Sequence, residues 1–419
     1  MWKRWISPLV LLLVGAWGAV AQAPYQHCAA QALRAEHLAA HAERRAAVER
    51  LEAFTQNFRP DLATERQLAT IPVVVHLLWQ DPSQNLSDEI IASQIDALNR
   101  DFQKRNPNRL QIPDDFAPLA TSIGLEFCLA STDPQGQASS GILRRQSTVD
   151  CIGNVGEVRL NGRPRLYYPE LGGSAAWDPL RYLNIWVAPT CGAFLGIGTF
   201  PETVPPAEDG IIVDPLYFGI RPADSPSFPF HLGKTATHEV GHYLNLQHTW
   251  GQRGCEVDDQ VADTPQQETE YRNCPIHPIS SCGSPDMFMN FMNYVDDECL
   301  MLFTEGQRLR MWAAITASRP DLLTSDVCTP PDPVRTNPLT IYPNPARDCI
   351  HLLLEADPAD EFNLYLIDSQ GRRVYAASLR GESLQSIDVQ GLASGVYWVQ
   401  VVREKVVYSG KVLVLPNSF

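Results

Sequence analysis

The sequence has few basic residues and no long apolar run beyond its first residues, and both shortages narrow its possible functions. Its 419 residues contain 33 Lys and Arg against 48 Asp and Glu, a net charge of −15. This charge repels phosphate backbones and argues against nucleic acid as the main partner. No segment after the N-terminal leader is apolar enough to cross a membrane. A composition of 44% hydrophobic and 19% charged residues, without a repeat of fixed period, is typical of a globular protein.

The N-terminus predicts secretion. Two basic residues precede a short apolar core, Pro8–Val14, and small residues follow, which is the order of a secretory signal peptide. Pro24 follows the second of two possible cleavage sites and should block it. We therefore expect a signal peptide over residues 1–21, with a retained membrane anchor as the alternative. Ten cysteines also suit an oxidising compartment.

Composition divides the rest of the chain into further parts. Residues 22–68 have apolar positions at helical intervals and predict a helical pro-segment. Residues 69–328 open with the buried-strand run IPVVVHLL and a helix capped by Ser87, so they predict an α/β domain. A proline-rich linker is expected over residues 329–338, because proline cannot pair regularly in a sheet. Short strands separated by turn residues over 339–419 predict an all-β sandwich.

The segment HEVGHYLNLQH, residues 238–248, carries a metal-binding pattern. His238 and His242 lie one turn apart on one helix face, so both can reach the same Zn²⁺. His248 follows six residues later, a spacing that no straight helix presents on that face. The chain must turn, and Asn245 is the residue best able to take the left-handed conformation that ends a helix. Three nitrogen ligands leave a position for water, which is typical of a catalytic zinc site.

Glu239 lies beside these ligands without being one of them. We expect it to act as the general base on a zinc-activated water and then to pass the proton to the leaving amine. Histidines on an ordinary helix surface are the alternative, which this spacing disfavours.

HEVGHYLNLQHTW resembles the extended zinc motif of the metzincin metallopeptidases, and most of all the pappalysin branch, over about residues 70–325. The resemblance implies a zincin-like catalytic domain with a mixed twisted sheet and an active-site helix, acting on protein or peptide substrates. The family usually has glycine at the position of Asn245. MFMNFMNYVDDECLMLFT resembles the family's Met-turn region, which implies Met292 beneath the zinc. It also implies Tyr294 beside the zinc as a donor to the oxyanion, with a packing role as the alternative.

The loop between the two motifs is rich in carboxylates. Asp258, Asp259 and Asp263 offer oxygen ligands close to Thr264. The resemblance implies a structural Ca²⁺ here, and dense carboxylates on a short loop suit that ion. Solvated loop acids are the alternative.

Five cysteines have specific expectations. The resemblance implies disulfides joining Cys255 with Cys282 and Cys274 with Cys299, whereas the sequence alone allows three pairings of these four. Related pappalysin zymogens carry a cysteine near the start of the pro-segment whose thiolate can occupy the open zinc position. Cys28 matches that place, and latency through zinc binding or an ordinary disulfide both remain open for it.

The last part of the chain resembles the C-terminal sorting domain of type IX secretion in IYPNPARD, LIDSQGRRV, LASGVYWVQV and YSGKVLVL. This implies recognition by outer-membrane secretion machinery and a secreted or surface-attached product, generally after removal of the domain. A carbohydrate- or protein-binding sandwich is the alternative.

Two functional classes remain for the whole chain. One is a secreted zinc-dependent endopeptidase made as a latent zymogen. The other is a non-catalytic surface adhesin or binding protein that keeps a zincin fold. Intact Glu239 and all three histidines favour the enzyme.

Overall fold

The computed structural model describes residues 26–59, 68–328, 335–353, 361–369, 372–380, 384–403 and 406–416. The expected signal peptide lies outside the described residues. The chain divides into two compact units, Met1–Thr329 and Pro330–Phe419, and each is described by itself. Within the described ranges, no helix is long and apolar enough to cross a membrane.

The first described segment is a short strand followed by two helices. β1 (Gln26–Cys28) leads into α1 (Ala30–Ala40) and α2 (Ala42–Asn57). α2 lies beside α6 (Glu305–Ser318), and Leu51 of α2 is buried. The helices agree with the helical periodicity of residues 22–68, whereas that periodicity gave no sign of the strand.

A mixed sheet forms the centre of the larger unit, with the strand order β1-β9-β10-β8-β2-β4, and β5 also pairs with β2. Every pair is parallel except β9 with β10, which is antiparallel. The strands are β2 (Ala69–Trp79), β4 (Leu125–Leu129), β5 (Ile142–Gln146), β8 (Leu183–Val187), β9 (Phe194–Gly198) and β10 (Ile211–Val213). β2 is buried along most of its length, as its continuous apolar run predicts. Short strands β3 (Ala120–Thr121), β6 (Arg159–Leu160), β7 (Arg163–Pro164) and β11 (Phe303–Thr304) lie outside this sheet.

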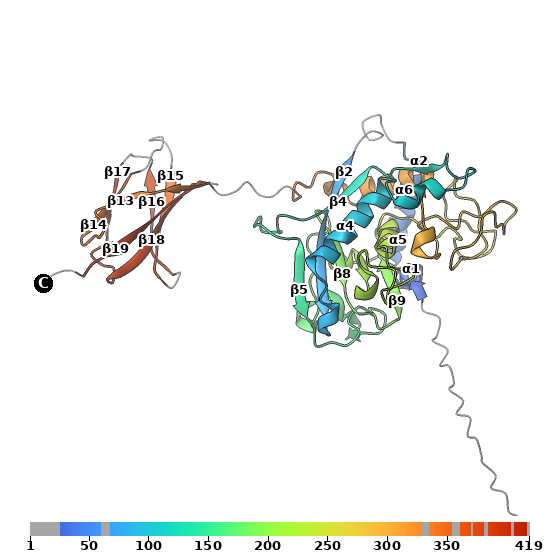
Figure 1. Cartoon of the computed structure of the whole chain (residues 1–419), viewed down its shortest axis with the longest axis horizontal. Helices are drawn as coiled ribbons and strands as arrows, with labels where there is room; N and C mark the ends of the chain where they lie inside the picture. The colour runs from blue at the N-terminus through green and yellow to red at the C-terminus, as the bar shows by residue number, and fades with distance from the viewer. Residues whose placement is uncertain are drawn as a thin grey trace, which may run out of the picture. The chain divides into compact units, whose positions relative to one another are not determined.

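Two helices pack near this sheet and position the site (Figure 1). α4 (Asp88–Phe102) begins where the Ser87 side chain accepts the N–H of Ile90, the cap that the sequence predicts. α5 (Lys234–Tyr243) contacts β9, β10 and α4 and is buried at every position. A helix buried all round cannot shift without disturbing the core, so α5 is a rigid support.

Four disulfides hold the larger unit together. Two of them join Cys255 with Cys282 and Cys274 with Cys299, the pairing that the family resemblance implies. The others join Cys128 with Cys328 and Cys151 with Cys191. Cys28 and Cys349 carry thiols.

The smaller unit contains two sheets of order β12-β19-β18-β15-β16 and β13-β14-β17. Their strands are β12 (Arg335–Pro338), β13 (Thr340–Tyr342), β14 (Cys349–Leu353), β15 (Glu361–Ile367), β16 (Arg373–Arg380), β17 (Leu384–Asp388), β18 (Gly395–Arg403) and β19 (Val406–Val414). Every pair is antiparallel except β12 with β19. Buried residues of both sheets, among them Ile350 and Val399, belong to one apolar cluster.

One expectation about the linker needs correction. Residues 335–338 were expected within a linker that cannot pair, but they form β12, which pairs in parallel with β19. β12 is an edge strand with hydrogen bonds on one side only, so it tolerates Pro338 at its end.

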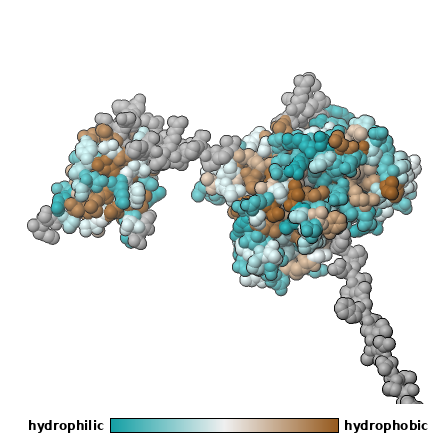
Figure 2. All heavy atoms as spheres, viewed as in Figure 1, coloured by the Kyte–Doolittle hydropathy of each residue, from teal (hydrophilic) through white to brown (hydrophobic). Residues whose placement is uncertain are grey.

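The surface of the larger unit is mostly hydrophilic on the face in Figure 2, with hydrophobic residues in scattered patches. Such scattered residues are ordinary for a folded protein and do not by themselves indicate a binding site. The predicted zinc-binding residues lie instead on and next to the buried helix α5.

Candidate metal centre and active site

Three histidines meet at the C-terminal end of α5. The Nε2 atoms of His238, His242 and His248 lie 3.0–3.2 Å from one another, and all three side chains are buried. The chain reverses after α5 through Asn245, whose φ is 72°, the left-handed conformation that the sequence predicts. This turn brings His248 back to the two helical histidines.

The hydrogen bonds of the other ring nitrogens fix which atoms can bind a metal. Each Nδ1–H donates over 2.8 Å to an oxygen: Phe291 O from His238, Leu246 O from His242 and Gln31 Oε1 from His248. Each Nε2 therefore carries a lone pair that points at two others, an arrangement that is repulsive unless a cation lies between them. Burial lowers the pKa of His238 to about 4 and the pKa values of His242 and His248 well below 6.5, which favours neutral ligand imidazoles. The donor set fits Zn²⁺.

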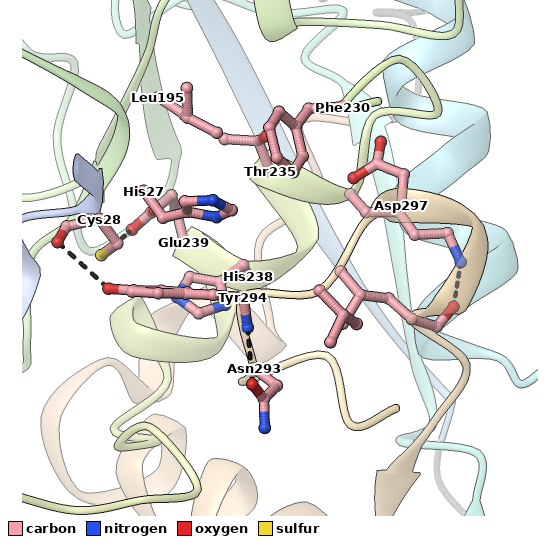
Figure 3. Close-up of a pocket in the computed structure, with 13 residues that line it drawn as sticks. His27, Cys28, Leu195, Phe230, Thr235, His238, Glu239, Asn293, Tyr294 and Asp297 are labelled. Atoms are coloured by element: carbon pink, nitrogen blue, oxygen red, sulfur yellow. Dashed lines mark hydrogen bonds between the residues drawn. The ribbon is translucent and has the colours of Figure 1, made fainter. Parts of the chain in front are cut away.

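Glu239 lies beside this cluster and is 1% exposed. Burial raises the pKa of its carboxyl to about 8, while hydrogen bonds from the Cys28 thiol and the Gly198 amide oppose that rise. The Cys28 Sγ lies 3.2 Å from Glu239 Oε2 (Figure 3). A carboxyl whose pKa lies near neutrality can both accept and return a proton.

Met292 and Tyr294 of the expected Met-turn region both lie close to α5 and the three histidines. The sulfur of Met292 lies so close to Gly241 of α5 that any Cβ there would overlap it. The Tyr294 ring lies 5.6 Å from that of His238 and 4.9 Å from that of His248. Burial raises the pKa of the Tyr294 phenol well above 10, so the hydroxyl remains a donor.

Cys28 brings a fourth donor to the three histidines. Its Sγ and one nitrogen of each histidine all lie within 4.8 Å of one another. Its backbone oxygen accepts the Tyr294 hydroxyl at 3.2 Å (Figure 3). The preceding His27 ring stacks on Tyr294, with 4.7 Å between ring centroids.

A small pocket opens beside Glu239 and is lined by His27, Phe230, Thr235 and Asp297, among others (Figure 3). Asp297 accepts the backbone N–H of Leu232 at 2.7 Å. Burial raises the pKa of Asp297 to about 7, so near neutrality it holds only part of a negative charge.

The acidic loop is arranged differently. Asp259 accepts hydrogen bonds from the Thr264 hydroxyl and the Val261 amide, and Asp263 accepts them from the Thr304 hydroxyl and the Gly306 amide. Asp258 accepts the Gln260 amide. Among the described residues, the histidines with Cys28 form the only group of three or more such donors close enough to share an ion. The loop therefore does not gather the predicted calcium ligands into such a group.

The chain is similar to known metallopeptidases. Residues 173–316 match the peptidase family model described as pregnancy-associated plasma protein-A. Extracellular metalloprotease 1 of Coccidioides posadasii is 30% identical over 274 residues, covering 64% of this chain and 82% of that protein. An extracellular metalloprotease of Verticillium alfalfae is 41% identical over 264 residues, covering 60% of this chain and 78% of the relative. The chain belongs to the pappalysin family of metallopeptidases.

This pappalysin is also similar to solved structures. A Tannerella forsythia promirolysin mutant is 32% identical with a TM-score of 0.63, covering 71% of this chain and 97% of that one. Mature mirolysin in complex with a cleaved peptide is 37% identical with a TM-score of 0.57, covering 61% and 96%. Together with the histidine cluster, these matches identify a zinc metallopeptidase and favour the enzyme over the adhesin.

Residues 340–415 of the pappalysin match the model of a secretion system C-terminal sorting domain. The match agrees with the expectation for the end of the chain, and the relatives are named as extracellular. The protein is therefore secreted or held at the cell surface.

Two residues of the site, Gln31 and Asn293, were not predicted from the sequence. Gln31, which orients His248, is 217 positions away in the chain. Asn293 bonds the side chains of Thr249 and Gln267, and its Oδ1 accepts the amide of Tyr294. The only signal for Asn293 in the sequence is its position between Met292 and Tyr294. The sequence contains no comparable signal for Gln31.

Proposed function

We propose that this pappalysin is made as a latent zymogen and hydrolyses internal bonds of extended protein chains, with Glu239 as the general base. One observation carries the proposal. Three Nε2 lone pairs meet at 3.0–3.2 Å while their Nδ1 protons are held elsewhere, and Glu239 lies beside them. A bound Zn²⁺ supplies Lewis acidity and lowers the pKa of water.

Glu239 moves the proton in the proposed reaction. Its carboxylate accepts a proton from the attacking water and returns that proton to the leaving amine. In the chain with its pro-segment, burial raises the pKa of Glu239 to about 8, and the Cys28 thiol lies against its carboxyl. Departure of Cys28 is proposed to admit water to Glu239 and to favour the carboxylate that accepts the proton.

Tyr294 is proposed to stabilise the oxyanion. Its hydroxyl already donates to a peptide oxygen, that of Cys28, at 3.2 Å. A substrate carbonyl is the same chemical group, and its oxygen accepts more strongly once it carries negative charge.

Extended substrates are proposed to bind along β9. β1 now pairs with β9 in parallel, with Gln26 opposite Phe194 and Cys28 opposite Gly196. Departure of β1 leaves the same backbone groups of β9 available to a substrate strand. Binding through the backbone explains why an internal stretch of an extended chain fits the site.

Latency is proposed to depend on the segment around Cys28. Its thiol reaches the donor group, its backbone covers the edge of β9, and His27 lines the pocket beside Glu239. A thiolate is a strong zinc ligand and excludes water from that position. The similarity to a structure titled promirolysin, covering 97% of that chain, supports a zymogen. Residues 22–68 are then the helical pro-segment.

We also propose a structural Ca²⁺ in the acidic loop. Burial raises the pKa of Asp259 to about 7, so ionising it at neutral pH is unfavourable without a cation. Asp258, Asp263 and Thr264 are the other proposed ligands. Calcium favours such oxygen donors, and moderate movement of the loop would be needed to gather them.

We propose that residues 339–419 form a β-sandwich that directs the chain to outer-membrane secretion machinery and is then removed. The sorting-domain match over 340–415 and the apolar cluster shared by its two sheets support this role.

The decisive variant for the reaction is Glu239→Gln. It should retain zinc and lose about 10²–10⁴-fold in kcat, because the carboxamide cannot accept the proton. Processed wild-type and variant enzymes are compared on a quenched protein substrate, with and without a chelator, and zinc is measured by elemental analysis. Glu126→Gln, on β4, is the matched control and should keep full activity. Equal cleavage by Glu239→Gln and wild type would exclude Glu239 as the general base, whereas no chelator-sensitive cleavage by processed wild type would favour the non-catalytic alternative.

A further inference from the structure

Two glycines of β9 face α5 at the point where α5 carries Glu239. A Cβ added to Gly196 would lie 2.7 Å from Cγ, 2.9 Å from Oε1 and 3.1 Å from Cδ of Glu239. A Cβ added to Gly198 would overlap the backbone oxygen of Glu239 and lie 2.9 Å from the Cβ of His242. Both glycines thus leave space for atoms of Glu239, Gly196 for its side chain and Gly198 for its backbone.

The backbone of β9 does not itself require glycine. Both residues lie in a regular strand paired with β10, where Ile211 is opposite Gly198 and Val213 is opposite Gly196. Glycine inside a strand weakens it, and its usual reason is the close approach of another group. Here the approaching group is Glu239 with its helix.

The Glu239 carboxylate lies near β9 and near β1, the strand that pairs with β9. Cys28 of β1 pairs with Gly196, and its Sγ reaches Glu239 Oε2 at 3.2 Å. β9 therefore supplies the space for the side chain, and the neighbouring β1 supplies a hydrogen bond to it.

We propose that Gly196 is a positioning residue for the side chain of Glu239 and that Gly198 sets the separation of α5 from β9. This inference rests on the proposed role of Glu239 as general base. The two positions act on different atoms: the three atoms nearest to a Cβ at Gly196 belong to the Glu239 side chain, whereas those nearest to a Cβ at Gly198 belong to the Glu239 backbone and to His242. Their substitutions therefore have different consequences.

Gly196→Ala should displace the carboxylate and leave the imidazoles in place. We expect kcat of the processed enzyme to fall on the order of 10²-fold, with KM and zinc content unchanged. Gly198→Ala should lower the zinc content as well, because it pushes against the helix that carries His242. Gly156→Ala is the matched control, since the nearest atom to its Cβ is Asn154 Oδ1 at 3.7 Å, and it should change none of these quantities.

A double-mutant cycle on the full chain tests the contact without using activity. Gly196→Ala should lower the Tm of the wild-type chain but have little effect in Glu239→Ala, which lacks the three atoms that the new methyl meets. If Gly196→Ala alone does not fold, the inference requires the double variant to fold. An equal loss of Tm in both backgrounds would overturn the inference.

The two proposals fail separately. If the effects of Gly196→Ala and Glu239→Ala on Tm are strongly coupled but Gly196→Ala leaves kcat unchanged, the positioning role is overturned. An inactive Glu239→Gln would still support Glu239 as the general base. An active Glu239→Gln would remove the general base and the positioning role with it, although the coupling in Tm would still report the contact.

Discussion

The histidine cluster and the acidic loop are two groups of potential metal ligands in one unit, and they are built in opposite ways. In the cluster, Nδ1 of each histidine donates to an oxygen while the Nε2 atoms face one another at 3.0–3.2 Å. In the loop, Asp259 and Asp263 accept hydrogen bonds from hydroxyls and backbone amides of the protein. Convergence of atoms that no other group satisfies is therefore stronger evidence for a metal than the density of suitable residues.

Asp263 shows how a loop carboxylate can be satisfied by groups of the protein itself. Its oxygens accept the Thr304 hydroxyl at 2.7 Å and the Gly306 amide at 2.8 Å, at the N-terminus of α6. A negative charge is favourable there, because the first amides of a helix have no partner within the helix. The loop is thus held to α6 by its own carboxylate.

The largest expected effect is the loss of zinc and of cleavage when a histidine of the cluster is replaced, compared with a histidine elsewhere in the chain. His242→Ala removes one of three converging ligands, so bound zinc and cleavage should both fall by orders of magnitude. Elemental analysis and cleavage of a protein substrate measure the two losses. His41→Ala, at the exposed junction of α1 and α2, should change neither. Full zinc occupancy in His242→Ala would show that the cluster is not the zinc site.

The next effect concerns the fourth donor. Cys28→Ala should raise the cleavage activity of the unprocessed chain several-fold or more, because the thiol no longer competes with water. Activity is followed alongside the intact chain on a gel, so that processing is separated from loss of latency. Cys349→Ala, which removes the other thiol, should leave latency unchanged. Unaltered latency in Cys28→Ala would assign the block to the covered β9 edge.

A smaller effect is expected in the loop. Asp263→Asn weakens the contacts with α6 and should lower the free energy of unfolding by about 1 kcal/mol in chelator. The loss should be larger in calcium, where the substitution also removes a proposed ligand. Chemical unfolding of the full chain in both buffers measures this. Asp96→Asn, on the exposed side of α4, is the matched control. If the free energy of unfolding falls only in calcium, Asp263 stabilises the protein as a calcium ligand and its contacts with α6 contribute little.

A further effect is a pH dependence of stability at Asp259. Burial raises the pKa of its carboxyl from 3.8 to about 7, so its favourable contribution to stability is present below pH 3.8 and is lost as pH rises through about 7. In chelator, Asp259→Asn should therefore gain Tm relative to wild type between pH 5 and pH 8, since it never ionises. Added calcium should reverse that gain if the ion binds there. A flat difference between pH 5 and pH 8 in chelator would contradict the buried, cation-free carboxyl.

Local patterns predicted much of this architecture. The Ser87 cap, the apolar run of β2 and the turn at Asn245 each depend on a few neighbouring residues, and all three occur in the structure. The family resemblance supplied the cysteine pairing, which spacing alone left open.

Features that depend on distant contacts escaped prediction. β1 is a strand because β9 offers it an open edge, and nothing within its three residues indicates this. The hydrogen bond from His248 to Gln31 and the space at Gly196 for Glu239 are likewise fixed only by folding. The extent of the linker was wrong for the same reason, since β19 recruits Arg335–Pro338 as its neighbour.

Anomalous diffraction at the zinc absorption edge, from crystals of the full unprocessed chain, tests the central claim most directly. One strong peak is expected about 2.0–2.1 Å from the Nε2 atoms of His238, His242 and His248, with the Cys28 sulfur about 2.3 Å from it. A zinc-replete crystal with no peak among these three nitrogens, or with its peak in the acidic loop, would contradict it.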